Sequence, residues 1–329
     1  IILTSALMCV APLAFAASEE KIRIILDTDA NNELDDQHAI AYLLFNSDVF
    51  EVEGITVNRT INGGKVKKHL AEAERVVRMC ASHPQIQVTK GANANYEDIL
   101  PHIGKAKFDG SAAVDLIIAR AKADDPRELV LMPIGKLTNI ALALKKDPSI
   151  AKKVRIVWLG TNYPDPGEYN FDNDIPSLDP ILEMDVPFEI VTVRYDKPSG
   201  TDAVKASIKD IRRIMPGKGP SIATPVPGRH GGKFSNFGDY SIELFNKFRE
   251  DATTRPLFDM AAVAITKNPT WAERTVIGAP KFRDGKWIDR PDNPRKIVLW
   301  ENFDTKGIMK DFYDRMENYV LASPEGCTK

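Results

Sequence analysis

The densest group of potential metal ligands in the chain is one acidic segment near its beginning. Residues 27–36 read Asp-Thr-Asp-Ala-Asn-Asn-Glu-Leu-Asp-Asp, with four aspartates and one glutamate within ten positions. Carboxylates this close together repel one another unless a cation lies among them, and hard oxygen ligands at this density favour Ca²⁺ or Mg²⁺. In a purely structural alternative, Asp35 and Asp36 would stabilise a helix start. That alternative leaves Asp27 and Asp29, which directly follow an apolar stretch, without an explanation.

Five short apolar runs predict the strands that position this segment. They are nearly continuous rather than alternating, as expected for strands covered on both faces of a parallel sheet. Helical patterns fall between and after them, and strands alternating with helices predict an α/β fold with a mostly parallel central sheet flanked by helices. The runs are Ile22–Leu26, Val52–Val57, Leu129–Met132, Val154–Leu159 and Phe188–Val193, and the helical patterns are Val66–Cys80, Leu116–Ala123, Leu137–Leu144 and Lys306–Leu321.

Three further polar segments directly follow expected strands. Asn58–Asn62 comes after the second run, Pro133–Asn139 after the third, and Gly160–Asp174 after the fourth. Ligands of open α/β sheets bind outside the carboxyl ends of the strands. We therefore expect these segments to meet the acidic segment at one edge of the sheet. The least regular region, Pro216–Asp239, is either a mobile lid or a long surface connection.

Composition favours a small neutral ligand. The 329 residues carry a formal net charge of −2 and are 43% hydrophobic, which is ordinary globular composition. There is no basic field to attract nucleic acid, so no nucleic-acid partner is expected. No segment approaches the roughly 20 apolar residues that a membrane span needs, so no membrane partner is expected either.

The first sixteen residues look like a targeting segment. Ile1–Ala16 is uncharged and ends in the small-x-small pattern Ala14-Phe15-Ala16, typical of the hydrophobic region and cleavage site of a signal peptide. We therefore expect an exported chain with one domain over residues 17–329; the alternative is a short buried helix. Cys80 and Cys327 would remain after cleavage, and no framework of spacings supports a disulfide between them.

At the acidic segment the chain resembles the inosine–uridine type nucleoside hydrolases, whose first strand ends in Asp-x-Asp and leads to an Asp-Asp pair at the next helix. Three more segments resemble family motifs in the same order, so the resemblance covers most of the chain after residue 17. They are Gly135–Ala141, which resembles G-x-L-T-N-[IL]-A, then Asn162 followed by Gly167-Glu168-Tyr169-Asn170, and finally Phe258-Asp259 in place of a late His-Asp pair.

The resemblance implies a role for each residue that matches a motif. The Ca²⁺ ligands would be Asp29, Asp36, the backbone carbonyl of Thr138 and Asp259. The ribose hydroxyls would be bound by Asp35, Asn162, Glu168 and Asn170. After the second strand, Asn58, Thr60 or Asn62 could support the ligands, and we place Asn58 in the substrate-binding set. The family also tends to form oligomers, which implies a homo-oligomer here.

The implied reaction is hydrolysis of the N-glycosidic bond of a ribonucleoside, giving ribose and free base. Its transition state resembles an oxocarbenium ion, so the site must stabilise positive charge and present a nucleophile. Clustered carboxylates meet the first need. For the second, the resemblance implies that Asp29 deprotonates a water held by Ca²⁺.

The acidic segment departs from the commonest form of the family by its length. Five residues separate Asp29 from Asp35, two more than usual. The additional Asn31, Asn32 and Glu33 could add metal ligands or displace one. They leave open whether Asp35 or Asp36 is the bidentate ligand.

A second departure concerns the leaving group. Phe258 stands where many members place a histidine that protonates a departing purine, and phenylalanine has no proton to give. Either another group acts as the acid, with His230, Arg229, Tyr163 and Tyr169 as candidates, or the leaving group needs little help. We predict that purine nucleosides are cleaved slowly and that better leaving groups are favoured.

Phe258 also supports a rival hypothesis of another class, a Ca²⁺-dependent sugar-binding protein that has lost catalysis. A third hypothesis is a metal-dependent hydrolase of another bond, such as a phosphoester. Such an enzyme needs cations beside its carboxylates, and Lys136 is the lone nearby candidate in the sequence.

Overall fold

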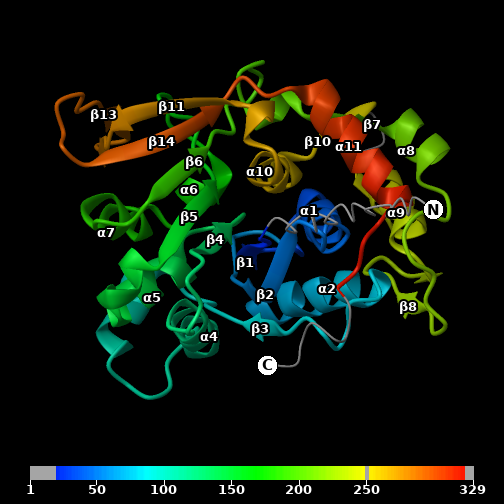
Figure 1. The fold of residues 1–329 in the computed structure, drawn as a ribbon, viewed down its shortest axis with the longest axis horizontal. Helices are drawn as coiled ribbons and strands as arrows, with labels where there is room; N and C mark the ends of the chain where they lie inside the picture. Colours follow the sequence, from blue (N-terminus) through cyan, green and yellow to red (C-terminus); the bar gives the residue numbers. More distant parts are fainter. Residues whose placement is uncertain (1–19, 249–251, 323–329) are drawn as a thin grey trace, which may run out of the picture.

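The computed structural model describes residues 20–248 and 252–322, which are organised around an eight-stranded sheet (Figure 1). The strand order is β11-β14-β6-β5-β4-β1-β2-β3, and every neighbouring pair is parallel except β11 with β14. The predicted fold class is therefore confirmed. The strands are β1 (Ile22–Thr28), β2 (Phe50–Val57), β3 (Val88–Lys90), β4 (Leu129–Pro133), β5 (Val154–Leu159), β6 (Phe188–Val191), β11 (Glu273–Gly278) and β14 (Lys296–Glu301).

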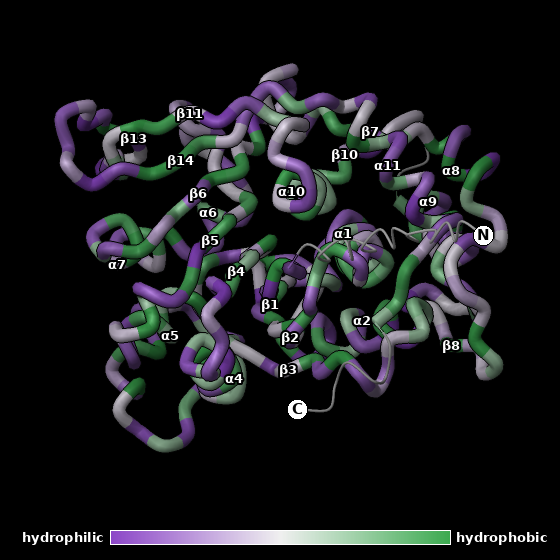
Figure 2. Tube along the Cα trace, in the orientation of Figure 1, coloured by the Kyte–Doolittle hydropathy of each residue, from purple (hydrophilic) through white to green (hydrophobic). Residues whose placement is uncertain are grey.

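Helices cover both faces of this sheet because successive strand side chains point to opposite sides. In β1, Ile24 and Leu26 pack into one hydrophobic core and Ile25 into the other. Hydrophobic residues also run along β6 and β14 in Figure 2. The first core includes helices α1 (Asp35–Leu44), α2 (Val66–Met79), α8 (Ile208–Ile214), α9 (Phe237–Phe248), α10 (Phe258–Lys267) and α11 (Thr305–Glu317); the second includes α3 (Tyr96–Ile99), α4 (Ser111–Ala121), α5 (Thr138–Lys146) and α7 (Asp179–Glu183).

Smaller elements lie outside the main sheet. Among them, the irregular region 216–239 contains a short hairpin and the start of α9. The two-stranded sheets pair β7 (Lys205–Ser207) with β10 (Thr254–Pro256), β8 (Val226–Pro227) with β9 (Lys233–Phe234), and β12 (Lys281–Arg283) with β13 (Lys286–Ile288). The short helix α6 spans Tyr169–Asp172.

The parallel register brings the predicted polar segments to one edge of the sheet. Asp27 in β1 lies opposite Thr56 in β2 on one side and Pro133 in β4 on the other. The loops that follow β1, β2 and β4 therefore leave the sheet side by side, as expected for the carboxyl ends of parallel strands.

Two sequence predictions fall wholly or partly outside this description. Residues 1–16, expected to be a signal peptide, and Cys327 lie outside the described residues, while Cys80 is buried. Over the part that is described, no helix has the length and apolarity needed to cross a bilayer.

Candidate active site

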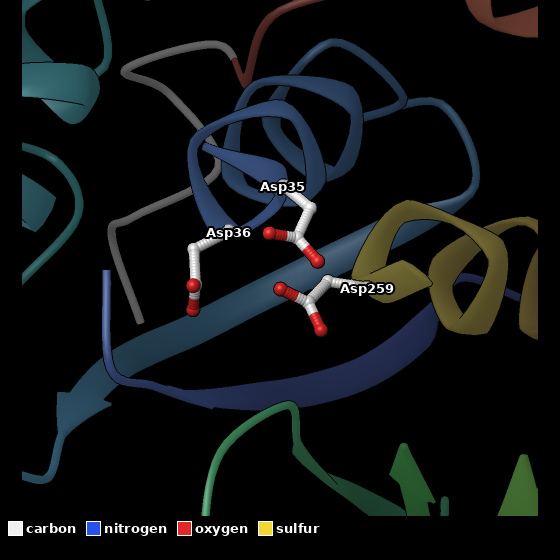
Figure 3. Close-up of side chains that lie close together, drawn as sticks. All are labelled: Asp35, Asp36 and Asp259. Atoms are coloured by element: carbon white, nitrogen blue, oxygen red, sulfur yellow. The ribbon is translucent and has the colours of Figure 1, made fainter. Parts of the chain in front are cut away.

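Three carboxylates converge from the starts of two helices. Asp35 and Asp36 open α1, and Asp259 is the second residue of α10. Figure 3 shows the carboxylates of Asp35 and Asp259 close to each other, with that of Asp36 beside them. One oxygen from each lies within 4.8 Å of the others. A helix N-terminus favours a negative charge, so each element stabilises the carboxylates that it carries. Together they form an all-oxygen donor set drawn from distant parts of the sequence.

Protein neighbours balance only part of the negative charge in this cluster, through the ion pair between Arg255 and Asp35. Burial, together with the mutual repulsion of the aspartates, raises the pKa of Asp36 and of Asp259 well above the ordinary value. Burial likewise raises the pKa of Asp35 to about 7. Repulsion of this kind is relieved by a cation, and carboxylate oxygens are the donors that hard divalent ions prefer. The residues present therefore fit a metal ion.

Asp29 lies beside this cluster at the end of β1. It lines the same cavity as the three clustered aspartates, and its charge contributes to the raised pKa of Asp36. Its carboxylate accepts a hydrogen bond from the Thr60 hydroxyl, and burial raises its pKa to about 6. A Cβ at Gly135 would lie 3.0 Å from Asp29 Oδ1, so glycine is required by this close approach.

Asp27 does a different task from Asp29, although the two are separated by one residue. Its carboxylate accepts hydrogen bonds from Thr56 Oγ1 at 2.6 Å, Asn58 Nδ2 at 2.8 Å and Asn139 Nδ2 at 2.7 Å. These bonds tie β1 to β2 and to α5 beneath the cavity. Asp27 therefore holds the sheet edge in place and does not face the cavity.

The four aspartates open into a cavity of about 380 Å³, within the usual size range of small-molecule sites. Its wall also includes aromatic side chains and two ion-paired cations, Lys205 and Arg255. The residues that matter below are Asp29, Glu33, Asp35, Asp36, Ile134, Glu168, Tyr169, Asn170, Tyr195, Lys205, Arg255, Phe258 and Asp259.

Glu168 faces the acidic cluster from another side of the cavity. It precedes α6, and its carboxylate accepts hydrogen bonds from the backbone N–H groups of Thr161, Asn170 and Phe171 at 2.9–3.0 Å. Burial still raises the pKa of Glu168 to about 7. These backbone bonds fix the carboxylate in one orientation, with lone pairs left to accept hydroxyl groups.

Asn170, the second residue of α6, offers the cavity only its side-chain oxygen. Its Nδ2 donates to the carbonyls of Ile134 and Leu159, both at 3.1 Å. Since an amide nitrogen has two hydrogens, both are used, and Oδ1 is left for a ligand as an acceptor.

Thr138 is not among the residues that line the cavity, and the role of its carbonyl as a metal ligand stays a prediction. Thr138 begins α5, where a carbonyl points along the helix axis toward the next turn, and its hydroxyl donates to Asp174. Ile134, four residues earlier at the end of β4, lines the cavity instead.

Asn162 and Asn58 also lie behind the cavity wall rather than on it. Asn162 Nδ2 donates to the Gly167 carbonyl at 2.7 Å, and its Oδ1 accepts from the Tyr195 backbone N–H at 3.2 Å. Asn58 donates to Asp27, as described above. Each of these two side chains holds a loop in this structure, and their contact with ribose stays a prediction.

The additional residues of the acidic segment fasten it to its neighbours. Asn31 Nδ2 donates to the Gly63 carbonyl at 2.7 Å. Glu33 pairs with Arg255, whose Nη2 also lies 3.2 Å from Asp35 Oδ1. The longer loop thus bridges β1 to the segment before α10, and Arg255 is a residue that sequence reasoning missed.

The candidates for the missing acid are mostly elsewhere. Tyr163 donates to Asp289, and His230 pairs with Glu243 beside Arg229, so none of these three lines the cavity. Tyr169 does line it, and its hydroxyl accepts from the Asn62 backbone N–H at 3.0 Å. Sequence reasoning missed Tyr195, since no motif carries it.

The fold and the site define the chain as an α/β protein with an acidic metal centre at the carboxyl edge of its sheet. The description "Inosine-uridine preferring nucleoside hydrolase" belongs to the family model that matches residues 24–306. The chain therefore belongs to that family, as its motifs predicted. The family is metal-dependent, in agreement with the buried acidic cluster.

Individual relatives agree with this assignment. The chain is 31% identical over 162 residues to a probable uridine nucleosidase of Oryza sativa, covering 44% of this chain and 45% of the relative. It is 30% identical over 159 residues to an inosine-uridine preferring nucleoside hydrolase of Leishmania major, covering 43% and 49%. The matches thus span about half the length of these curated relatives.

Solved structures share the fold over nearly the whole length. A plant nucleoside hydrolase superposes with a TM-score of 0.70 at 17% identity, covering 90% of this chain and 99% of the other. A purine-preferring ribonucleoside hydrolase from Gardnerella vaginalis gives 0.66 at 22% identity, covering 89% and 98%. At these identities the likeness shows the common fold.

Proposed function

We propose that this protein hydrolyses the N-glycosidic bond of a ribonucleoside, releasing ribose and a free base, and that it requires Ca²⁺. The observation that carries the proposal is the convergence of Asp35, Asp36 and Asp259, beside Asp29, in one cavity of nucleoside size. Family membership supports the reaction class, and the relatives named above include nucleosidases.

The donor set favours Ca²⁺ as the ion. Asp36 and Asp259 would hold it together with an oxygen of Asp29, and a cluster made only of oxygens suits its flexible coordination of 6–8 ligands. When bound, Ca²⁺ would supply positive charge that orients a sugar diol and acidifies a water molecule.

The side chains around the ion divide the remaining work. Asp29 would accept the proton of the attacking water, a task that suits a carboxylate whose pKa burial raises to about 6. Asp35 would accept hydrogen bonds from the ribose diol. Glu168 and Asn170 Oδ1 would accept the other hydroxyls, since their remaining hydrogen-bonding capacity is as acceptors.

The carboxylates would also stabilise the transition state. Charge develops on the sugar as the bond to the base breaks, and buried, preoriented carboxylates interact with that charge more strongly than water does. Phe258 offers no proton to the departing base. Bases that leave readily should therefore be released faster than unactivated purines.

A substrate panel with chelation tests this function. Ribose release would be measured with inosine, adenosine, uridine, cytidine and 4-nitrophenyl riboside, with and without EGTA. We expect release that stops on chelation and returns with added Ca²⁺, and faster turnover of 4-nitrophenyl riboside than of inosine. Tight Ca²⁺-dependent binding without release would instead support a sugar-binding protein. Equal turnover of the two substrates would contradict the prediction about leaving groups.

Two further proposals concern the setting of the protein. We propose that it is exported, on the strength of the apolar Ile1–Ala16 and its small-x-small end, and that it assembles as a homo-oligomer, as the family resemblance implies. N-terminal sequencing of protein recovered from outside the cytoplasm should begin near Ala17, and light scattering should give a multiple of the chain mass.

A further inference from the structure

Tyr195 lies beside Phe258 in the cavity, where a proton donor for the departing base is missing. Its ring meets the Phe258 ring edge-on, with 5.8 Å between the ring centroids, and both line the cavity. Phe258 directly precedes Asp259 of the acidic cluster. A polar group on Tyr195 therefore lies beside the position from which Phe258 can donate nothing.

The backbone around Tyr195 is held in a conformation that ordinary residues avoid. Arg194 and Asp196, on either side, have φ values of 48° and 59° in the left-handed region. Non-glycine residues persist there only where their surroundings hold them, and such strain gathers at functional sites. The strained segment turns the intervening side chain into the cavity.

Several contacts hold this segment, among them the ion pair between Arg194 and Glu301. Arg194 Nε donates to the Tyr163 carbonyl at 2.9 Å and its Nη1 to Ser199 Oγ at 3.1 Å. The Tyr195 backbone N–H donates to Asn162 Oδ1 at 3.2 Å. Asn162, which the sequence motif assigned to ribose, thus serves to place Tyr195.

The Tyr195 hydroxyl has a hydrogen to give. Its oxygen accepts a weak bond from the Tyr169 backbone N–H at 3.4 Å, and within the described residues its own hydrogen has no acceptor. Burial, and then the charge of Glu168, raises the pKa of Tyr195. The hydroxyl therefore stays protonated throughout the range in which an enzyme of this kind would work.

Arg255 flanks Phe258 on another side but is a weaker candidate. Its guanidinium lies 5.2 Å from the centre of the Phe258 ring. It already pairs with Glu33 and Asp35, which satisfies its charge. The Nε of Arg255 also has no partner among the described residues, but protein atoms cover it, whereas Tyr195 is 39% exposed. Tyr195 is therefore the neighbour of Phe258 whose donor a bound base can reach.

We propose that the Tyr195 hydroxyl donates a hydrogen bond to the departing base, in place of the acid that Phe258 cannot supply. The inference rests on the proposed function. The bond between C1′ and the base nitrogen breaks, and its electron pair stays on the base. Water adds to C1′ and gives its proton to Asp29. The base, stabilised as an anion by Tyr195, takes its proton from solvent.

Substitution of Tyr195 by phenylalanine tests the proposal, because Tyr195→Phe removes only the hydroxyl. The loss of a hydrogen bond to a charged group should lower kcat for uridine and inosine roughly tenfold to a hundredfold. Turnover of 4-nitrophenyl riboside should stay within about twofold, since nitrophenolate leaves without such help. KM should change little, because the bond strengthens only as charge develops.

Two further variants sharpen this result. Tyr163→Phe removes a hydroxyl that bonds to Asp289 outside the cavity, and it should leave both substrates unaffected. Phe258→His in the Tyr195→Phe background places a new donor beside the lost one, and it should restore most of the nucleoside activity. That recovery would also show that Tyr195→Phe remains folded.

Equal losses on nucleosides and 4-nitrophenyl riboside would overturn the proposal, since they indicate a packing role. Unchanged nucleoside turnover in Tyr195→Phe would overturn it as well. If the unaltered protein releases no ribose from any substrate, the proposed function itself fails, and the role of Tyr195 fails with it.

Discussion

At the scale of single residues, the acidic cluster is arranged for a ligand at a cost to stability. Asp35, Asp36 and Asp259 are buried together, and their repulsion contributes to raising the pKa of Asp36 and Asp259. A carboxylate that merely capped a helix would not be placed against two others. Substitutions that remove one of these charges can therefore distinguish a metal site from carboxylates that only cap helices.

Replacement of Asp259 by asparagine should abolish function and stabilise the metal-free fold. Asp259→Asn removes a ligand itself, and since the loss of a group that merely hydrogen-bonds to a ligand already costs roughly 10–100-fold in metal affinity or activity, the loss of a ligand should cost more. It also removes one of three mutually repelling buried charges, so Tm in EGTA should rise. Ribose release, metal content and thermal melts would be measured together. The control is Asp147→Asn, which changes a 3₁₀-helix cap outside the cavity and should alter neither activity nor metal content. If Asp259→Asn instead lowers Tm in EGTA, the capping explanation would be favoured over the metal site.

His38 illustrates the opposite case, a residue near the site in sequence that serves the core. Its ring is fully buried, packs edge-on against Phe237 and Phe245, and bonds the Leu34 carbonyl at 2.6 Å and Ser241 Oγ at 2.7 Å. Burial lowers its pKa from 6.5 to about 4. We therefore assign it a structural role.

This lowered pKa predicts a pH dependence of stability. In the unfolded chain His38 takes up its proton near pH 6.5, whereas in the folded chain it resists until about pH 4. The free energy of unfolding should thus fall as pH drops from 6.5 to 4, by roughly 3 kcal/mol at ~1.4 kcal/mol per pKa unit. In urea unfolding, the free energy of unfolding of His38→Asn should depend less steeply on pH than that of the unaltered protein. The control His83→Asn changes an exposed histidine and should keep the pH dependence of the unaltered protein. Parallel curves for all three would contradict this account.

At the scale of elements, the longer loop between β1 and α1 and the segment from β10 to α10 act as one unit. Arg255 joins them by pairing with Glu33 and Asp35, and its guanidinium lies 4.8 Å from the centre of the Phe248 ring. It therefore orients Asp35 from an element that starts far away in the sequence.

Removal of this bridge should weaken substrate binding. Arg255→Met keeps the apolar contact with Phe248 but leaves Asp35 without its partner, so KM should rise, on the order of tenfold, because loss of one charged hydrogen bond costs about that much. Glu33→Gln keeps a hydrogen-bond acceptor for Arg255 and should have a smaller effect. Lys310→Met, which breaks the exposed pair with Asp314, is the control. A change in kcat alone would show that the bridge does not orient Asp35.

The elements that the sequence predicted best are those whose side chains are buried on both faces. The apolar runs that predicted β1, β2, β4, β5 and β6 are continuous because helices cover both sides of the sheet. Three strands were missed: β3 and β11 at the edges of the sheet, and β14, although its residues Ile297–Trp300 form a continuous buried apolar run. β3 has three residues, and β11 exposes alternate side chains such as Val276, so neither has a continuous apolar run.

The site was predictable only where a motif fixes both residue and orientation. Asp35, Asp36 and Asp259 occupy the starts of helices, where geometry leaves little choice of direction, and the structure places their carboxylates together. Asn162 and Tyr195 lie in loops. Their directions depend on the positive φ of Arg194 and on bonds to distant chain segments, which no local pattern records.

At the scale of the whole molecule, the parallel sheet explains how one site draws on so much of the chain. Each strand delivers its following loop to the same edge, so Asp29 after β1 and Glu168 after β5 face one cavity. α10 then brings Asp259 to the cluster from the C-terminal part of the chain. Metal binding at this point would link early and late segments of the fold.

That linkage makes the stability of the entire domain depend on the ion. A ligand that binds only the folded state raises the free energy of unfolding by about 2.7 kcal/mol when its concentration is a hundred times its Kd. For a domain of this size or slightly smaller, that corresponds to a rise of roughly 4–8 °C in Tm. We expect Tm to rise with the logarithm of Ca²⁺ concentration and to fall on addition of EGTA. Mg²⁺ should act more weakly, since it sheds its own waters reluctantly. Asp259→Asn should melt at one temperature whatever the Ca²⁺ concentration. If the Tm of the unaltered protein did not depend on Ca²⁺, the folded protein would not bind the ion, and the chemistry proposed for the cavity would be contradicted.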